Sequence, residues 1–209
     1  LGFVRFDDRR GGSMYLSYND QFRTGGIRSA SVMVFGNSFE TFDNQNQQRG
    51  IFFRSSVTTR SDLGFSLQAE TERFEDEEER TVGIGFDYNV SNRFKRFGID
   101  YTFGERDGSN TEFLRASASY RLPIGIDLGL SHSFLNFEGY TDQTVLTLGW
   151  EIDPKQSLTA RFVNSNGNEN FYLAYQSSGG TGMDWFLIIG DPNAGEFTNR
   201  LSLKFVWAR

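Results

Sequence analysis

The feature that most constrains this chain is the alternation of apolar and polar residues along most of its length. In residues 82–88, Val82, Ile84 and Phe86 alternate with glycine and aspartate. Successive side chains of a β-strand point to opposite faces, so this pattern predicts strands with one apolar and one polar face. The same pattern recurs in residues 63–70, 97–103, 114–121 and 201–207, whereas no segment has convincing helical spacing. The chain is therefore predicted to be all-β.

Breaks rich in glycine, proline, asparagine and charged residues divide the chain into about fourteen predicted strands. One strand with its turn takes about fifteen residues, which suits membrane strands of roughly nine to eleven residues better than soluble strands of roughly five or six. The breaks lie near residues 7–12, 23–26, 43–50, 60–62, 74–80, 91–93, 104–111, 123–125, 138–141, 153–155, 164–169, 177–182 and 190–199.

The composition favours strands that cross a membrane. Only 37% of residues are hydrophobic, yet 16% are aromatic, and no stretch approaches the roughly 18 apolar residues of a transmembrane helix. Lipid offers no partner to backbone N–H and C=O groups, so membrane strands must close into a barrel. We therefore predict one domain over residues 1–209, a closed antiparallel up-and-down transmembrane β-barrel. A soluble β-sandwich or β-rich repeat protein is the alternative.

The breaks also predict which rim faces outward. With the C-terminus placed on the periplasmic side, the periplasmic breaks are tight (60–62, 91–93 and 153–155) and the outer ones longer (43–50, 104–111 and 190–199). This contrast is typical of outer-membrane barrels. Aromatic residues near strand ends are expected in interfacial belts. They are Tyr88, Phe103, Tyr120, Trp150 and Trp207.

The last strand resembles the C-terminal assembly signal of bacterial outer-membrane proteins. Leu203 and Phe205 alternate with polar residues, and Trp207 supplies the terminal aromatic. Ser202 stands where glycine is usual, and two residues follow the aromatic. The resemblance implies a Gram-negative outer membrane, with the barrel-assembly machinery, outer-membrane lipid and lipopolysaccharide as partners.

Residues 184–191 and 199–207 also resemble the end of a family of uncharacterised barrels. In that family a carbohydrate-binding-like module precedes an outer-membrane barrel. The resemblance implies that this chain is the C-terminal part of a longer protein, whose module would lie before Leu1. The family's activity is undefined, so no catalytic residue follows from it.

Several kinds of site are excluded by composition. The chain has no cysteine, one histidine and a net charge of −6. This excludes disulfides, thiolate chemistry and a poly-histidine zinc site, and disfavours nucleic acid as a partner. No cofactor or metal is expected. Carboxylates of the acidic run at 70–79 suit divalent cations, but the run lacks the spacing of a calcium loop, and a solvated outer loop is the simpler interpretation.

His132 is the first place to look for an enzyme. It shares the phase of the apolar residues on its strand, while Ser131 and Ser133 point to the opposite face. Neither serine can be its nucleophilic partner, so no catalytic residue is assigned and the chain is not expected to be an enzyme.

Charged residues in the polar phase are candidates for lining a lumen. In a wide pore they would set ion selectivity, whereas in a narrow barrel they would pair and fill the interior. Residues 185–189 are apolar in both phases, which predicts contact with a plug, a partner protein or an adjacent chain, or a place near the barrel seam. The lumen candidates are Arg115, Arg121, Arg161, Asp87, Asp100 and Asp127, together with Glu70.

Three functions follow from these predictions. The leading one is a porin-like pore for transport of small solutes across the outer membrane. The second is a membrane anchor or scaffold for a preceding domain or a partner subunit. The third, disfavoured by the lack of a partner for His132, is an outer-membrane hydrolase.

Overall fold

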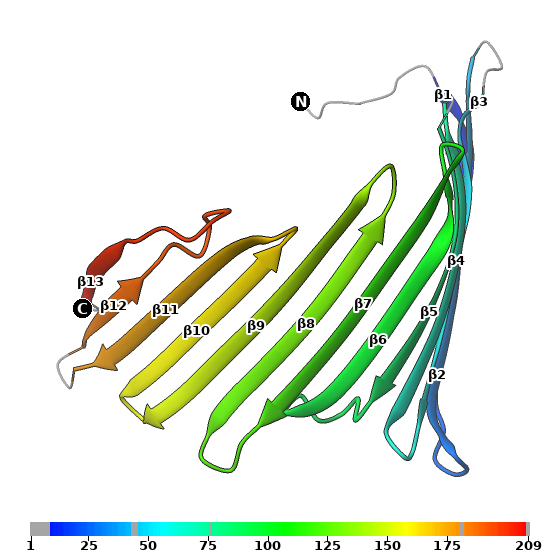
Figure 1. The fold of residues 1–209 in the computed structure, drawn as a ribbon. Helices are drawn as coiled ribbons and strands as arrows, with labels where there is room; N and C mark the ends of the chain where they lie inside the picture. The colour runs from blue at the N-terminus through cyan, green and yellow to red at the C-terminus, as the bar shows by residue number, and fades with distance from the viewer. Residues whose placement is uncertain (1–8, 43–45, 76, 180–181, 208–209) are drawn as a thin grey trace. The chain divides into compact units, whose positions relative to one another are not determined.

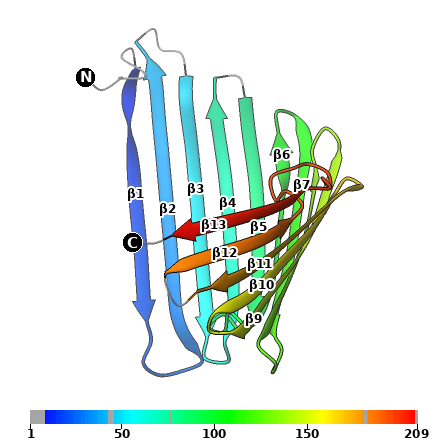
Figure 2. The ribbon, with the colours of Figure 1, turned by 90° about the vertical axis from the view of Figure 1, so that its left-hand side faces the viewer.

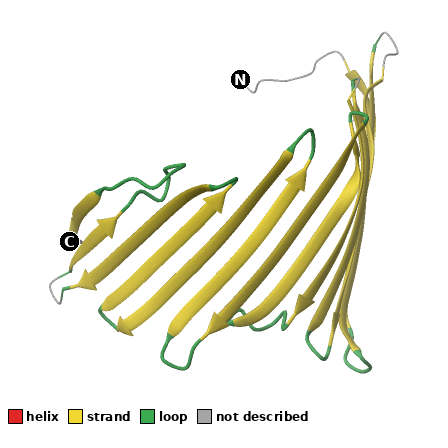
Figure 3. Cartoon of the chain, viewed as in Figure 1, coloured by secondary structure: helices red, strands yellow, loops and turns green. Residues whose placement is uncertain are grey.

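A computed structural model describes residues 9–42, 46–75, 77–179 and 182–207. In this part of the chain every regular element is a strand, and turns and loops join the strands (Figure 3). No helix among these residues is long and apolar enough to cross a membrane. Thirteen strands form one antiparallel sheet in sequence order, each beside the next (Figure 1). They are β1 Arg9–Gln21, β2 Ile27–Thr41, β3 Asn46–Thr59, β4 Leu63–Phe74, β5 Glu77–Tyr88, β6 Lys95–Arg106, β7 Ser109–Arg121, β8 Ile126–Asn136, β9 Tyr140–Asp153, β10 Gln156–Ser165, β11 Asn168–Ser178, β12 Met183–Ile189 and β13 Leu201–Trp207.

The all-β prediction is confirmed, and the thirteen strands correspond one to one with the last thirteen of the fourteen predicted. The first predicted strand, residues 1–6, lies outside the described residues.

Several turns are shorter than predicted. The break predicted at 104–111 is only residues 107–108, and the one at 74–80 is only 75–76. Charged side chains extend the strands here, because they pair across the ladder. Nε and Nη2 of Arg106 both donate to Oε2 of Glu79, at 2.9 and 2.7 Å, and the Glu78 N–H donates to Oδ1 of Asp107 at 2.9 Å.

The predicted contrast in turn length is wrong. Four connections on the expected outer rim have two or three residues: 75–76, 107–108, 137–139 and 166–167. On the opposite rim the connections 22–26, 89–94 and 122–125 are longer. Among the described outer connections only 190–200 is long, so turn length does not distinguish the rims.

The chain divides into two compact units. Unit 1 comprises residues 1–90, 99–114 and 135–140, as far as they are described, and holds β1–β5. Those five strands run side by side in Figure 2. Their register places apolar side chains in rows across one face. One such row is Leu16, Val34, Phe53, Ala69 and Val82.

Unit 2 comprises residues 91–98, 115–134 and 141–209, as far as they are described, and holds β10–β13. It has the same construction, because apolar residues on neighbouring strands again fall opposite one another. One row is Leu148, Ala160, Leu173, Ile189 and Leu201. In each unit we call the side that carries these rows the apolar face, and the other side the polar face.

The apolar faces are exposed. No hydrophobic residue in the described part of the chain is buried. Leu16 is 57% exposed, Ile84 54% and Leu201 70%. A water-soluble sheet protein buries such a face in a core. In the described part of this chain no other protein layer covers the apolar faces.

Candidate functional site

The polar face of unit 1 is built from small and hydrogen-bonding residues. Gly85 on β5 illustrates the packing, because a Cβ at this position would lie 2.6 Å from Oδ1 of Asp100 and would overlap the hydroxyl of Ser66. Glycine on β5 therefore makes room for polar side chains from the two neighbouring strands. This crowding holds those side chains close to the sheet.

One end of this face is rich in carboxylates. Glu72 and Glu79 are directly opposite in the β4–β5 register, and each is held by another strand. Gln48 Nε2 donates to Glu72 at 2.9 Å, and Arg106 pairs with Glu79 at 2.7 Å. The acidic run therefore does not form an outer loop: most of it continues two strands, with Glu70 half-buried beside this pair. The described residues contain no group of three or more side chains arranged to hold a metal ion.

The polar face of unit 2 carries an arginine–aspartate pair. Arg121 and Asp127 flank the turn at 122–125, and the guanidinium contacts both carboxylate oxygens at 2.5 Å. The same guanidinium stacks on Phe94, 3.6 Å from the ring centroid, and Arg93 lies 4.5 Å from that centroid. Two arginines therefore share one aromatic ring near the rim.

Residues 190–200 fold back over the polar face of unit 2. The side chain of Asn170, only 6% exposed, donates to the carbonyl oxygens of Asp191 and Ala194 at 3.0 and 2.7 Å. Arg161 Nη1 donates to the carbonyl of Pro192 at 3.5 Å. This segment was predicted as an outer loop, but Asn170 and Arg161 hold it against β10 and β11. It partly covers the charged face.

The structure brings some lumen candidates together and leaves others apart. Within unit 2, Arg121 pairs with Asp127 and Arg161 holds the 190–200 segment, while Arg115 is exposed on β7. The other three candidates are in unit 1, where Asp87 is opposite Gly64, Asp100 lies against Gly85, and Glu70 is half-buried on β4. All share the phase of the polar face. That these residues line a lumen stays a prediction.

Two residues of this face were not singled out from the sequence. Phe94 lies in a turn, and its neighbour Arg93 was the only hint of a cation–π contact. Asn170 stands in the polar phase of β11, but its role depends on a segment more than 20 residues away. The Arg121–Asp127 pair had a signal, because the two residues lie on either side of a break that contains proline and glycine.

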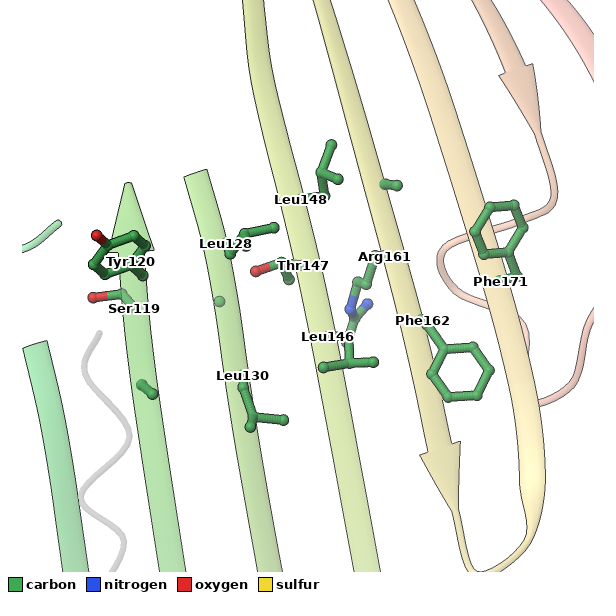
Figure 4. Close-up of a pocket in the computed structure, with 13 residues that line it drawn as sticks. Ser119, Tyr120, Leu128, Leu130, Leu146, Thr147, Leu148, Arg161, Phe162 and Phe171 are labelled. Atoms are coloured by element: carbon green, nitrogen blue, oxygen red, sulfur yellow. The ribbon is translucent and has the colours of Figure 1, made fainter. Parts of the chain in front are cut away.

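The apolar face of unit 2 has a shallow hollow of about 460 Å³ (Figure 4). Its lining includes the small residues Ala118 and Ala160 together with larger aliphatic and aromatic side chains. Its apolar lining offers few groups to hold water or a polar ligand. The larger side chains are Tyr120, Leu128, Leu130, Leu146, Leu148, Phe162 and Phe171.

Aromatic residues of unit 2 gather near one rim of the apolar face. This is the rim at which β7, β9 and β11 end. Tyr175 and Trp185 lie 5.3 Å apart between ring centroids, and Trp207 is 74% exposed. Such a belt is typical of a membrane–water interface. Its members are Tyr120, Trp150, Tyr175, Trp185 and Trp207, whereas Tyr88 and Phe103 are exposed on strands of unit 1.

His132 contacts a hydroxyl on the neighbouring strand. Its Nδ1 lies 2.9 Å from Oγ1 of Thr144. Among the described residues, no carboxylate bonds the imidazole to orient it, as a nucleophile–base pair needs. The arrangement is that of a histidine whose hydrogen bond is made with Thr144 on the adjacent strand.

No protein-family model matches the chain, and no curated protein matches it. Two solved structures of porins are similar to it. One, a KdgM porin in complex with disordered oligogalacturonate, is 12% identical with a TM-score of 0.36, over 76% of this chain and 86% of that one. The other, a KdgM porin, is 10% identical with a TM-score of 0.37, over 79% and 92% of the two chains. This similarity assigns neither a substrate nor a functional residue to the present chain.

Proposed function

We propose that this chain is a bacterial outer-membrane β-barrel that forms a pore for small solutes. The observation that carries the proposal is the opposition of two faces on the same strands. One is apolar and exposed, and the other holds fixed charges. A closed sheet with the apolar face toward lipid would satisfy the backbone and enclose the charged face as an aqueous lumen.

The polar face offers the groups that a selective pore needs. Arg115 and Arg161 place positive charge on β7 and β10, and Glu72 and Glu79 place negative charge on β4 and β5. Charges lining an aqueous pathway set its ion selectivity. Residues 190–200, held by Asn170, would narrow the pathway at one rim.

The test is conductance of the purified, folded protein in a planar lipid bilayer. We expect discrete conductance steps, and we expect Arg115→Gln and Arg161→Gln each to shift the reversal potential in a salt gradient toward cation preference. A correctly folded protein that inserts and gives no conductance would remove the pore proposal.

A membrane anchor or scaffold is the second candidate. Phe186 and Ile188 make β12 apolar on its polar face too, where Lys204 Nζ lies 5.9 Å from the Phe186 ring. Such a surface suits a partner protein. It would also suit a carbohydrate-binding-like module, such as the one that precedes the barrel in the family that residues 184–191 and 199–207 resemble. Purification from the native membrane tests this candidate. Recovery of this polypeptide alone would contradict the partner version.

We propose no enzymatic activity. A hydrolase built on His132 predicts lipolytic or proteolytic turnover that is lost in His132→Ala. Turnover by the wild-type protein that disappears in this variant would overturn the non-enzymatic assignment.

A further inference from the structure

The apolar face of unit 1 ends in a band of charged side chains at one rim. The strand register puts these residues on the same side as Leu16, Phe53 and Val82, beyond the apolar rows. The rim is the one at which β4 ends and β5 begins. The band consists of Arg10, Glu40, Arg49, Arg73, Glu78 and Arg80.

Two arginines in this band face each other. Arg49 on β3 and Arg73 on β4 are directly opposed in the register, and both are exposed. Like charges directly opposite one another destabilise a sheet. Among the ion pairs of the described residues, none joins either guanidinium to a carboxylate, and Nε of Arg73 donates to the carbonyl oxygen of Glu75 at 3.3 Å. Glu78, which is opposite Arg73, instead pairs with Arg80 at 2.5 Å.

The two arginines border a hollow that is polar at one side and apolar at the other. The hollow has a volume of about 350 Å³ and is lined by Arg49, Gly50, Ile51, Thr71, Arg73 and Glu78. Ile51 is 57% exposed and is the residue from which the apolar face continues along β3. An occupant that fits both parts carries an anionic group joined to a hydrocarbon chain.

We propose that Arg49 and Arg73 bind a phosphate group of lipopolysaccharide, whose acyl chains lie along the apolar face beyond Ile51. The proposal rests on the outer-membrane placement proposed above. Guanidinium groups bind phosphate through paired charge-assisted hydrogen bonds, and an anion between the two arginines removes their mutual repulsion. Counted strand by strand from a periplasmic C-terminus, the rim that carries this band would be the outer rim of such a barrel, where lipopolysaccharide resides.

The test compares lipid A that carries both phosphates with dephosphorylated lipid A. Binding to the folded protein in detergent is measured by native mass spectrometry. We expect the phosphorylated form to bind at least about tenfold more tightly, and the variant R49Q/R73Q to lose most of this difference. Arg54→Gln is the matched control, because Arg54 lies on the same strand with its side chain on the polar face. It should retain the preference.

Equal binding of the two lipids by the wild-type protein would overturn the proposal, even if the double variant fails to fold. Displacement of lipid A by inorganic phosphate at comparable concentration would also overturn it, because the site would then bind a free anion. The same preparation in a planar bilayer separates the two proposals. Equal binding of the two lipids by a wild-type protein that conducts normally removes this inference alone, whereas absence of conductance removes the pore.

Discussion

The two faces of strand β4 differ in what surrounds their side chains. Phe65 and Leu67 are 48% and 41% exposed on the apolar face, with no protein layer over them. On the other face Ser66 and Gln68 lie against the glycines of β5. Burying one large aliphatic side chain stabilises a folded protein by about 1.5–3 kcal/mol, so a whole exposed apolar face is untenable in water. The difference between the two faces indicates that one face of the sheet contacts lipid and the other contacts water.

The largest expected difference between the two faces comes from placing a charge on each face of β4. Leu67→Arg should destabilise the folded protein in lipid vesicles by about 2–4 kcal/mol, because the guanidinium would enter the hydrocarbon region. Gln68→Arg, one residue along the strand, should have a much smaller effect. Urea titration of the protein folded into vesicles measures both. Equal losses would mean that the two faces share one solvent.

Glycine on the polar face provides the next test. A Cβ at Gly104 would overlap the carbonyl oxygen of Arg80 and lie 2.7 Å from Cα of Thr81, so Gly104→Ala should cost about 1–3 kcal/mol of stability. Gly12, in the apolar phase of β1, has nothing within 4 Å of the same position, and Gly12→Ala is the control. Comparable titration midpoints for the two variants would argue against close packing on the polar face.

The polar face of unit 2 differs from that of unit 1 in being partly covered by the 190–200 segment. Asn170→Ala removes two hydrogen bonds to this segment, each contributing about 1 kcal/mol. If the segment narrows a pore, single-channel conductance should rise as the segment is released. Unchanged conductance, together with lowered stability, would show that the segment only braces β11.

The strands were predictable because each face of the sheet contacts one kind of environment along its whole length. Apolar and polar residues therefore alternate regularly along each strand. The turn lengths were not, since the paired charges of Arg106 and Glu79 extend strands that look like polar loops. The fold of 190–200 depends on contacts with Asn170 and Arg161, which lie more than 20 residues away along the chain. Periodicity carries no information about such a contact.

The smallest expected effect belongs to the Arg121–Asp127 pair. Both side chains are more than a third exposed, at 35% and 41%, so solvent screening should leave only a weak coupling between them. A double-mutant cycle with Arg121→Gln and Asp127→Asn measures this coupling in the same vesicle titration. Weakening of the coupling by salt would sharpen the comparison, because it places the pair in contact with an aqueous phase.

The central claim is that the two faces of each strand meet lipid and water. The chain has no cysteine, so single cysteines at positions 65 to 70 report on each side chain in turn. In the native membrane, a membrane-impermeant thiol reagent should label positions 66, 68 and 70 and spare 65, 67 and 69. Spin labels at the spared positions should be relaxed by oxygen dissolved in the lipid. Uniform labelling along the strand, or labelling in the opposite phase, would contradict the account.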